Sequence, residues 1–214
     1  METKKIELKI LLSSVAIIIL VEAAARIFLP SGKSVIIPVV GAARVVEVSL
    51  ILLVIFFWTS GLSSIGLARD QILPGIIKGL IWAAGFGLAA ALCMALVYAA
   101  GINPIRLIQT SLPSESRNVV VYFIVGGLVA PAAEEIFFRG IIYGFFRRWG
   151  VLLALLISTL LFIAAHPGGA VLPLTQIAGG FVFALAYEIE GCLMVPILIH
   201  SLGNLTIFAL TLFF

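Results

Sequence analysis

The stretch VVVYFIVGGLVAPAAEEIFFRGIIYGFF, residues 119–146, is a long apolar run that carries three charged residues in its second half. A helix that crosses a bilayer perpendicularly needs only about 20 residues, so this run predicts a tilted or broken membrane span. Pro131 lies inside the run and has no backbone donor, which favours a kink or a helix restart just before Ala132. The stretch therefore indicates a membrane protein with charge inside the bilayer.

The composition of the whole chain agrees with this location. Of 214 residues, 63% are hydrophobic and 11% are charged, which lies outside the range of soluble domains. We predict an all-α, polytopic transmembrane helix bundle of roughly seven or eight spans. It is expected to form a single domain over residues 1–214. The 13 Lys and Arg residues are scattered, so no nucleic-acid partner is expected. Cys93 and Cys192 lie far apart and indicate neither a disulfide framework nor a zinc spacing.

The apolar segments divide the chain into predicted spans. They cover residues 11–29, about Val35 to Trp58, Ile76 to Ala100, Val119 to Phe146, Val151 to Ala165, Val171 to Tyr187, and Cys192 to Phe214. The segment GLSSIGLARDQILPG, residues 61–75, mixes apolar and polar residues and favours an interfacial amphipathic helix.

The basic residues between these spans predict the orientation of the chain. With a cytoplasmic N-terminus, the basic residues on the cytoplasmic side would be Lys4, Lys5, Lys9, Arg69, Lys78, Arg147 and Arg148. The opposite side would hold Lys33, Arg106 and Arg117. This excess obeys the positive-inside rule, so we expect the N-terminus to be cytoplasmic.

A charged residue inside a membrane span carries a high free-energy cost of insertion. Such a residue is therefore expected to pair with another group or to serve a function. Glu22 and Arg26 are four residues apart, and Arg44 and Glu47 are three apart, so each pair shares a helix face. We interpret both pairs as neutralised packing contacts.

The adjacent Glu134 and Glu135 point about 100° apart on a helix and cannot serve the same role. Glu135 reaches Arg139 at i+4 and is expected to form an ion pair with it. Glu134 has no counter-ion on its own helix, so it is the candidate general base or acid. The alternative is a protonated glutamic acid that is hydrogen-bonded to another helix.

The remaining polar candidates are the two histidines of the chain and one asparagine. His166 ends a span and follows Phe162 by four residues. His200 and Asn204 share a face one turn apart, where both can donate to a single oxygen, as in an oxyanion hole. These residues supply a carboxylate that accepts a proton, a histidine that helps to hold a water and two donors for a negative oxygen. Together they indicate the active site of a hydrolase. Neither a serine elbow nor an HExxH motif is present, so a glutamate-activated water remains.

Three motifs carry a resemblance to a known family. EEIFFR at residues 134–139 is similar to EExxxR, FIAAH at 162–166 to FxxxH, and HSLGN at 200–204 to HxxxN. In this order, and inside apolar segments, they resemble the CAAX protease and bacteriocin-processing family of glutamic-type intramembrane endopeptidases. The resemblance covers about residues 119–210, which we expect to be the catalytic core.

The resemblance implies a role for each matched residue. Glu134 and His166 would activate water, and His200 and Asn204 would stabilise the oxyanion. The substrate-contacting or structural residues would be Glu135, Arg139 and Phe162. No metal is expected. A zinc site of Glu134, His166 and His200 is the alternative, which the scarcity of polar residues to orient metal-bound histidines disfavours.

The resemblance also indicates the partners and the cellular location of the protein. We expect membrane lipids and a membrane-anchored or lipidated protein substrate as partners, in a bacterial inner membrane. Helix rise counted from Arg147 and Arg148 places the site in the outer half of the bilayer, which suits a protease of C-terminal sorting signals. A non-catalytic membrane partner or bacteriocin self-immunity protein is one alternative function. A small-molecule or ion transporter is the other, although no internal repeat supports it.

Overall fold

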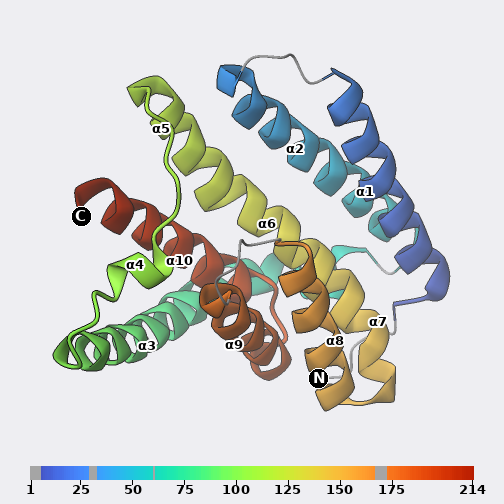
Figure 1. Cartoon of the computed structure of the whole chain (residues 1–214). Coiled ribbons are helices and arrows are strands. Elements are labelled where there is room, and N and C mark those ends of the chain that lie inside the picture. The colour runs from blue at the N-terminus through green and yellow to red at the C-terminus, as the bar shows by residue number, and fades with distance from the viewer. Residues whose placement is uncertain (1–5, 29–32, 60, 167–172) are drawn as a thin grey trace.

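The computed structural model describes residues 6–28, 33–59, 61–166 and 173–214. Every regular element in these ranges is helical, which confirms the predicted helical membrane bundle (Figure 1). The longer helices are α1 (Leu8–Phe28), α2 (Lys33–Trp58), α3 (Ile72–Ala99), α5 (Ser116–Ile124), α8 (Val151–Ala164), α9 (Leu174–Glu190) and α10 (Met194–Phe213). The shorter ones are η1 (Leu62–Ile65), η2 (Arg69–Gln71), α4 (Ile105–Ile108), η3 (Val125–Val129), α6 (Ala130–Glu135), η4 (Ile136–Tyr143), α7 (Gly144–Phe146) and η5 (Arg147–Trp149).

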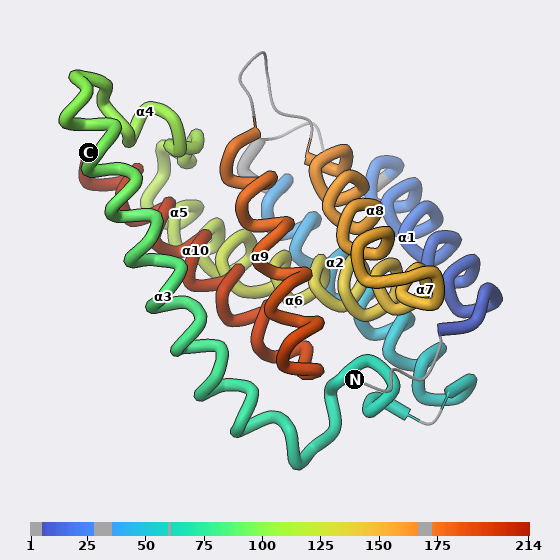
Figure 2. Tube along the Cα trace, turned by 90° about the horizontal axis from the view of Figure 1, so that it is seen from below, coloured from blue at the N-terminus to red at the C-terminus, as the bar shows by residue number. Residues whose placement is uncertain are grey.

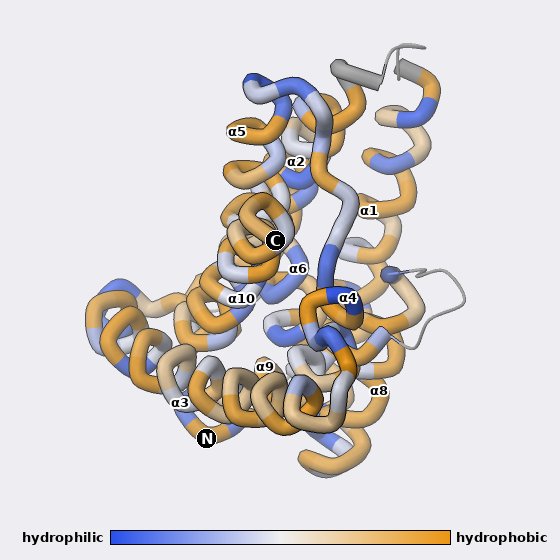
Figure 3. Tube along the Cα trace, turned by 60° about the vertical axis from the view of Figure 1, so that its left-hand side comes forward, coloured by the Kyte–Doolittle hydropathy of each residue, from blue (hydrophilic) through white to orange (hydrophobic). Residues whose placement is uncertain are grey.

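Five of the described helices are long and apolar enough to cross a membrane: Leu8–Ile27, Ile36–Trp58, Arg69–Ala99, Ser116–Trp149 and Met194–Phe213. The chain is therefore an integral membrane protein. The two other predicted spans correspond to α8, with 14 residues, and α9, with 17. Both are shorter than the roughly 20 residues of a full span. The predicted start of the second of these, Val171, lies outside the described residues. Apolar residues dominate all the long helices (Figure 3).

The predicted interfacial helix over residues 61–75 is wrong. The segment consists of the short 3-10 turns η1 and η2 followed by the start of α3. Gly66 has a left-handed backbone (φ 75°), which ends η1 and which a residue with a side chain rarely adopts. The carbonyl of Gly66 accepts a hydrogen bond from the backbone of Leu193, and that of Ile65 accepts one from the Tyr187 hydroxyl. Contacts with α9 and with the residue that precedes α10 thus fix this segment against the protein.

The stretch around Pro131 is one continuous helical segment from Ser116 to Trp149. Its hydrogen-bonding register changes twice, because η3 and η4 are π-helical. Pro131 lies at the start of α6, directly after η3, where the register already changes and the missing N–H is tolerated. π-helical insertions are often found at functional sites, and α6, which carries both glutamates, is enclosed by two of them.

The α6 segment is the centre of the bundle. It packs against α2 on one side and against α10 on another, while α8 packs on the adjoining η4. The hairpin of α1 and α2 covers one flank, and α9 lies between α8 and α10 (Figures 1 and 2). On the far side α3 runs along α10, where Gly75 and Gly79 are its buried residues and allow a close approach.

Candidate active site

The Glu134 carboxylate meets both histidines of the chain. Its Oε2 lies 3.4 Å from Nε2 of His166 and 3.8 Å from Nε2 of His200. Glu134 belongs to α6 and His200 to α10, whereas His166 lies two residues beyond the end of α8. Their side-chain exposure rises from 6% for His200 to 19% for Glu134 and 30% for His166. The cluster is therefore enclosed at His200 and opens toward His166.

The predicted ion pair between Glu135 and Arg139 is confirmed. The Nη1 atom of Arg139 donates to Oε1 of Glu135 at 2.9 Å, and both side chains are fully buried. The second guanidinium nitrogen, Nη2, donates to the carbonyl oxygen of Gly180 on α9 at 3.0 Å. The two adjacent glutamates thus have separate environments, as their directions on the helix predict.

Hydrogen bonds fix the orientation of both imidazole rings. Nδ1 of His166 lies 2.8 Å from the carbonyl oxygen of Phe162, and Nδ1 of His200 lies 2.8 Å from Oε1 of Glu135. Since a carbonyl and an ionised carboxylate only accept, each Nδ1 carries the proton. A neutral ring therefore presents the lone pair of Nε2 to Glu134, whereas a protonated ring presents an N–H donor.

Asn204 lies one turn beyond His200, as predicted, but the two side chains bond to different acceptors. Nδ2 of Asn204 donates to the carbonyl oxygen of Gly126 at 2.9 Å. This bond uses one of the two amide protons, and the other remains available. Gly126 belongs to the π-helical η3, so the wide turn before α6 supplies the carbonyl that orients Asn204.

Aromatic rings surround the polar groups. The Arg139 guanidinium lies 4.7 Å from the ring centre of Phe162, 5.3 Å from that of Phe183 and 6.0 Å from that of Phe138. The Phe183 ring also stacks on His200, with centroids 4.6 Å apart and planes at 20°. Cation–π contacts at these distances stabilise a buried guanidinium.

Phe183 and Gly180 were not predicted as site residues. A Cβ at Gly180 would lie 2.9 Å from Cγ2 of Thr159, so this glycine lets α9 approach α8 closely enough to present its carbonyl to Arg139. The two residues are three apart and share a helix face. The adjacent glycines at 179 and 180 are the sequence feature that could have indicated this contact, because small residues are common where helices pack in membranes.

One of the two ion pairs predicted within the first two spans differs in the structure. Arg44 pairs with Glu47, as expected. Glu22 pairs with Arg44 at 2.8 Å, whereas Arg26 is exposed. The predicted Glu22–Arg26 pair is therefore wrong, because packing of α1 on α2 brings a better-placed cation to Glu22 than its own helix offers.

Glu134, His166 and His200 are the residues that could hold zinc. Each histidine has an oxygen at Nδ1, so the expected scarcity of orienting partners is wrong. Nevertheless, no group of three or more His, Cys, Asp or Glu residues in the described ranges is arranged to hold a metal ion.

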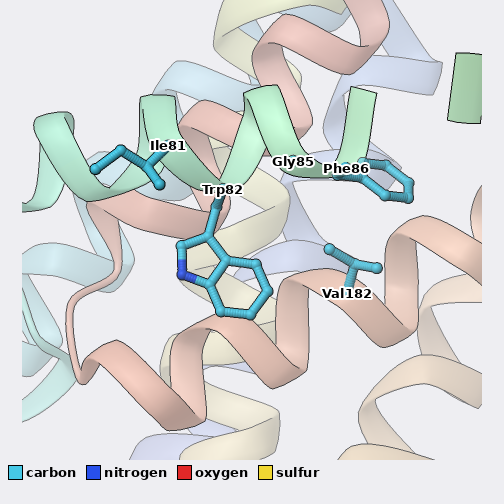
Figure 4. Close-up of a pocket in the computed structure, with 5 residues that line it drawn as sticks. All are labelled: Ile81, Trp82, Gly85, Phe86 and Val182. Atoms are coloured by element: carbon cyan, nitrogen blue, oxygen red, sulfur yellow. The ribbon is translucent and has the colours of Figure 1, made fainter. Parts of the chain in front are cut away.

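An apolar groove lies apart from this cluster, between α3 and α9 (Figure 4). It encloses about 380 Å³ and is lined by Ile81, Trp82, Gly85, Phe86 and Val182. At one end Glu190 accepts a hydrogen bond from Nε1 of Trp82 at 2.9 Å and pairs with Lys78 at 2.7 Å. None of the predicted site residues lines the groove.

Fold and site together define a helical integral membrane protein with a polar Glu/His/Arg cluster inside its bundle. Residues 116–206 match the family of type II CAAX prenyl endopeptidase Rce1-like proteins. This segment contains all seven predicted site residues: Glu134, Glu135, Arg139, Phe162, His166, His200 and Asn204. The resemblance predicted from the three motifs is thereby confirmed over this segment.

Similarity to individual proteins is more distant. An Escherichia coli protein named "Uncharacterized 24.3 kDa protein" is 28% identical over 152 residues, which make up 67% of this chain and 66% of that protein. The alignment thus spans about two thirds of the curated relative. No solved structure gives a significant match.

Proposed function

We propose that this protein is an intramembrane endopeptidase that uses a glutamate-activated water. One observation carries the proposal: Oε2 of Glu134 lies close to the Nε2 atoms of two histidines, one just beyond the end of α8 and one on α10. Both distances exceed the usual hydrogen-bond range, as is common for catalytic groups without substrate. The family match supports a peptidase over the alternative of a transporter.

In the proposed reaction, Glu134 accepts a proton from a water that His166 helps to hold. The water oxygen attacks the carbonyl carbon of the scissile peptide bond and forms a tetrahedral intermediate with a negative oxygen. Protonated Glu134 then transfers its proton to the amide nitrogen, the C–N bond breaks, and an amine and a carboxylic acid are released.

His200 and Asn204 are proposed to stabilise the negative oxygen. Because Nδ1 of His200 donates to Glu135, Nε2 can donate only when the ring is protonated. The buried Glu135 carboxylate holds the His200 ring through Nδ1, and Arg139 in turn anchors Glu135. Asn204 would use the amide proton that Gly126 leaves free. This arrangement gives Glu135 and Arg139 a structural role.

We further propose a bacterial inner membrane location with a cytoplasmic N-terminus. The substrate would be a membrane-anchored or lipidated protein that is cut near its embedded end. The partial exposure of His166 and Glu134 would give such a segment access to the cluster.

The test compares the membrane proteomes of cells that produce wild-type protein, Glu134→Gln or His166→Gln as the sole copy. We expect a small set of proteins to keep a C-terminal or leader segment in both variants and to lose it in the wild type. Glu115→Gln is the control, since Glu115 is exposed at the start of α5 and bonds to Asn118. Identical protein termini in all four strains would exclude the protease and leave the binding or immunity role.

A further inference from the structure

The apolar groove between α3 and α9 forms because α3 packs mainly on α10 and has little contact with α9. Trp82 extends from α3 toward α9, and Val182 extends from α9 toward α3, so the two side chains line the same groove (Figure 4). Gly85 also lines it, and a Cβ at this position would meet no described atom within 4 Å. A large side chain at position 85 would therefore occupy the groove.

The outer side of the groove faces the lipid. It lies along α3, one of the helices long and apolar enough to cross a membrane, and its residues Ile81 and Gly85 are exposed. The inner side is closed, because Trp82, Phe86 and Val182 pack against the buried core that contains the aromatic residues of the active site. The groove is thus accessible from the bilayer and separate from the Glu/His/Arg cluster.

One end of the groove is polar. Helix α9 ends there at Glu190, because Gly191 adopts a left-handed backbone (φ 63°). Nζ of Lys78 lies 2.7 Å from Oε2 of Glu190, and Nε1 of Trp82 donates to Oε1 at 2.9 Å. The Lys78 side chain is 50% exposed, and an ammonium has three donors, of which Glu190 uses one. Lysine and tryptophan are common where a helix meets the membrane surface.

The shape and chemistry of the groove match a lipid. From Lys78 to Phe86 it follows one face of α3 over eight residues, which is about 12 Å along the helix axis. Its volume of about 380 Å³ is within the range of sites for small molecules. The indole N–H of Trp82 is already bonded, so a peptide backbone would leave its polar groups unpaired in the groove. An acyl chain has no polar groups to pair.

We propose that this groove binds one glycerophospholipid with a primary ammonium head group, namely phosphatidylethanolamine. One acyl chain lies along Trp82, Gly85 and Phe86, the phosphate accepts hydrogen bonds from Lys78, and the ammonium donates to Glu190. The two side chains carry one positive and one negative charge, which a zwitterionic head group complements. A choline head group has no N–H donor, and a glycerol head group has no positive charge for Glu190. This site does not depend on the proposed function.

The test measures lipid retention by the full chain in detergent. Phosphatidylethanolamine, phosphatidylcholine and phosphatidylglycerol with the same acyl chains are added in equal amounts, and native mass spectrometry identifies the bound lipid. We expect the wild type to retain one phosphatidylethanolamine in preference to the other two lipids. Gly85→Leu is expected to abolish this retention. Lys78→Gln is expected to weaken it about tenfold, as for the loss of a hydrogen bond to a charged group.

Two variants are matched controls. Gly87→Leu adds the same side chain to α3 at an exposed position outside the groove lining, where a Cβ also meets no described atom within 4 Å. Lys78→Arg keeps the positive charge. Both are expected to retain the lipid like the wild type. Equal retention in Gly85→Leu and Gly87→Leu, or equal retention of the three lipids by the wild type, would overturn the proposal. A dimer without bound lipid that Gly85→Leu dissociates would also overturn it, because a second copy would then cover the groove.

A fluorescence measurement locates the bound chain. Trp82 is the only tryptophan left after Trp58→Phe and Trp149→Phe, since the chain has three. One equivalent of phosphatidylethanolamine with brominated acyl chains is expected to quench Trp82 in detergent, and Gly85→Leu is expected to relieve the quenching. Equal quenching with and without Gly85→Leu would contradict binding in the groove.

Discussion

Nδ1 of His200 lies 2.8 Å from Oε1 of Glu135, and this bond directs the other ring nitrogen toward Glu134. The second glutamate of the pair thus orients a ring that faces the first. Because Glu135 also binds Arg139, one buried carboxylate connects α6, η4 and α10. Its replacement is expected to affect stability and activity together.

Glu135→Gln leaves Arg139 fully buried without a charge partner. Breaking a buried pair in this way typically costs about 3 kcal/mol or more. We expect a clearly lower thermal denaturation midpoint in detergent, together with loss of proteolysis. Glu115→Gln, at an exposed position, is the matched control and should denature like the wild type. Equal midpoints for both variants would contradict a structural role for Glu135.

His166→Gln should separate activity from stability. The His166 side chain is 30% exposed, and its Nδ1 bond goes to a backbone carbonyl of its own chain segment. We expect substrate processing to fall by about 100-fold or more, the usual contribution of a general acid–base group. The denaturation midpoint should stay near that of the wild type. A large loss of stability would show that His166 is a packing residue.

Gly180→Ala places a methyl group 2.9 Å from Cγ2 of Thr159. Helix α9 must then move away from α8, which weakens the bond between Arg139 and the Gly180 carbonyl. We expect a loss of about 1–3 kcal/mol in stability, as for other overpacked sites. Gly85→Ala on α3 is the control, since no atom lies within 4 Å of its added Cβ. Equal denaturation midpoints would show that the contact adapts without cost.

Phe183→Leu removes the ring that stacks on His200 but keeps most of the apolar volume. A stacking interaction contributes about 1 kcal/mol, so a fall in proteolytic rate of about fivefold is expected if the ring holds His200 in its reactive orientation. Stability should fall by about 1 kcal/mol or more, because the buried ring also contacts the Arg139 guanidinium. Phe181→Leu, at an exposed position on the same helix, should behave like the wild type in both measurements.

Ion pairs between neighbouring residues of one helix could be predicted from the sequence. The spacing of Arg139 from Glu135 and of Glu47 from Arg44 is a local property, and both ion pairs were predicted correctly. The pairing of Glu22 was predicted wrongly, because the same reasoning ignored the cation on the next helix. The interfacial helix was wrong because Gly66 adopts a left-handed backbone that hydropathy does not reveal.

The amino-acid sequence by itself determined the helical membrane bundle, since long apolar segments must satisfy their own backbone hydrogen bonds in lipid. It also determined the separate directions of the two glutamates, since helical geometry is local. Only the tertiary structure decided that Glu134 faces two histidines, that Asn204 bonds to Gly126 and that Arg44 pairs with Glu22. These partners lie on different helices, and side-chain packing sets the distances between them.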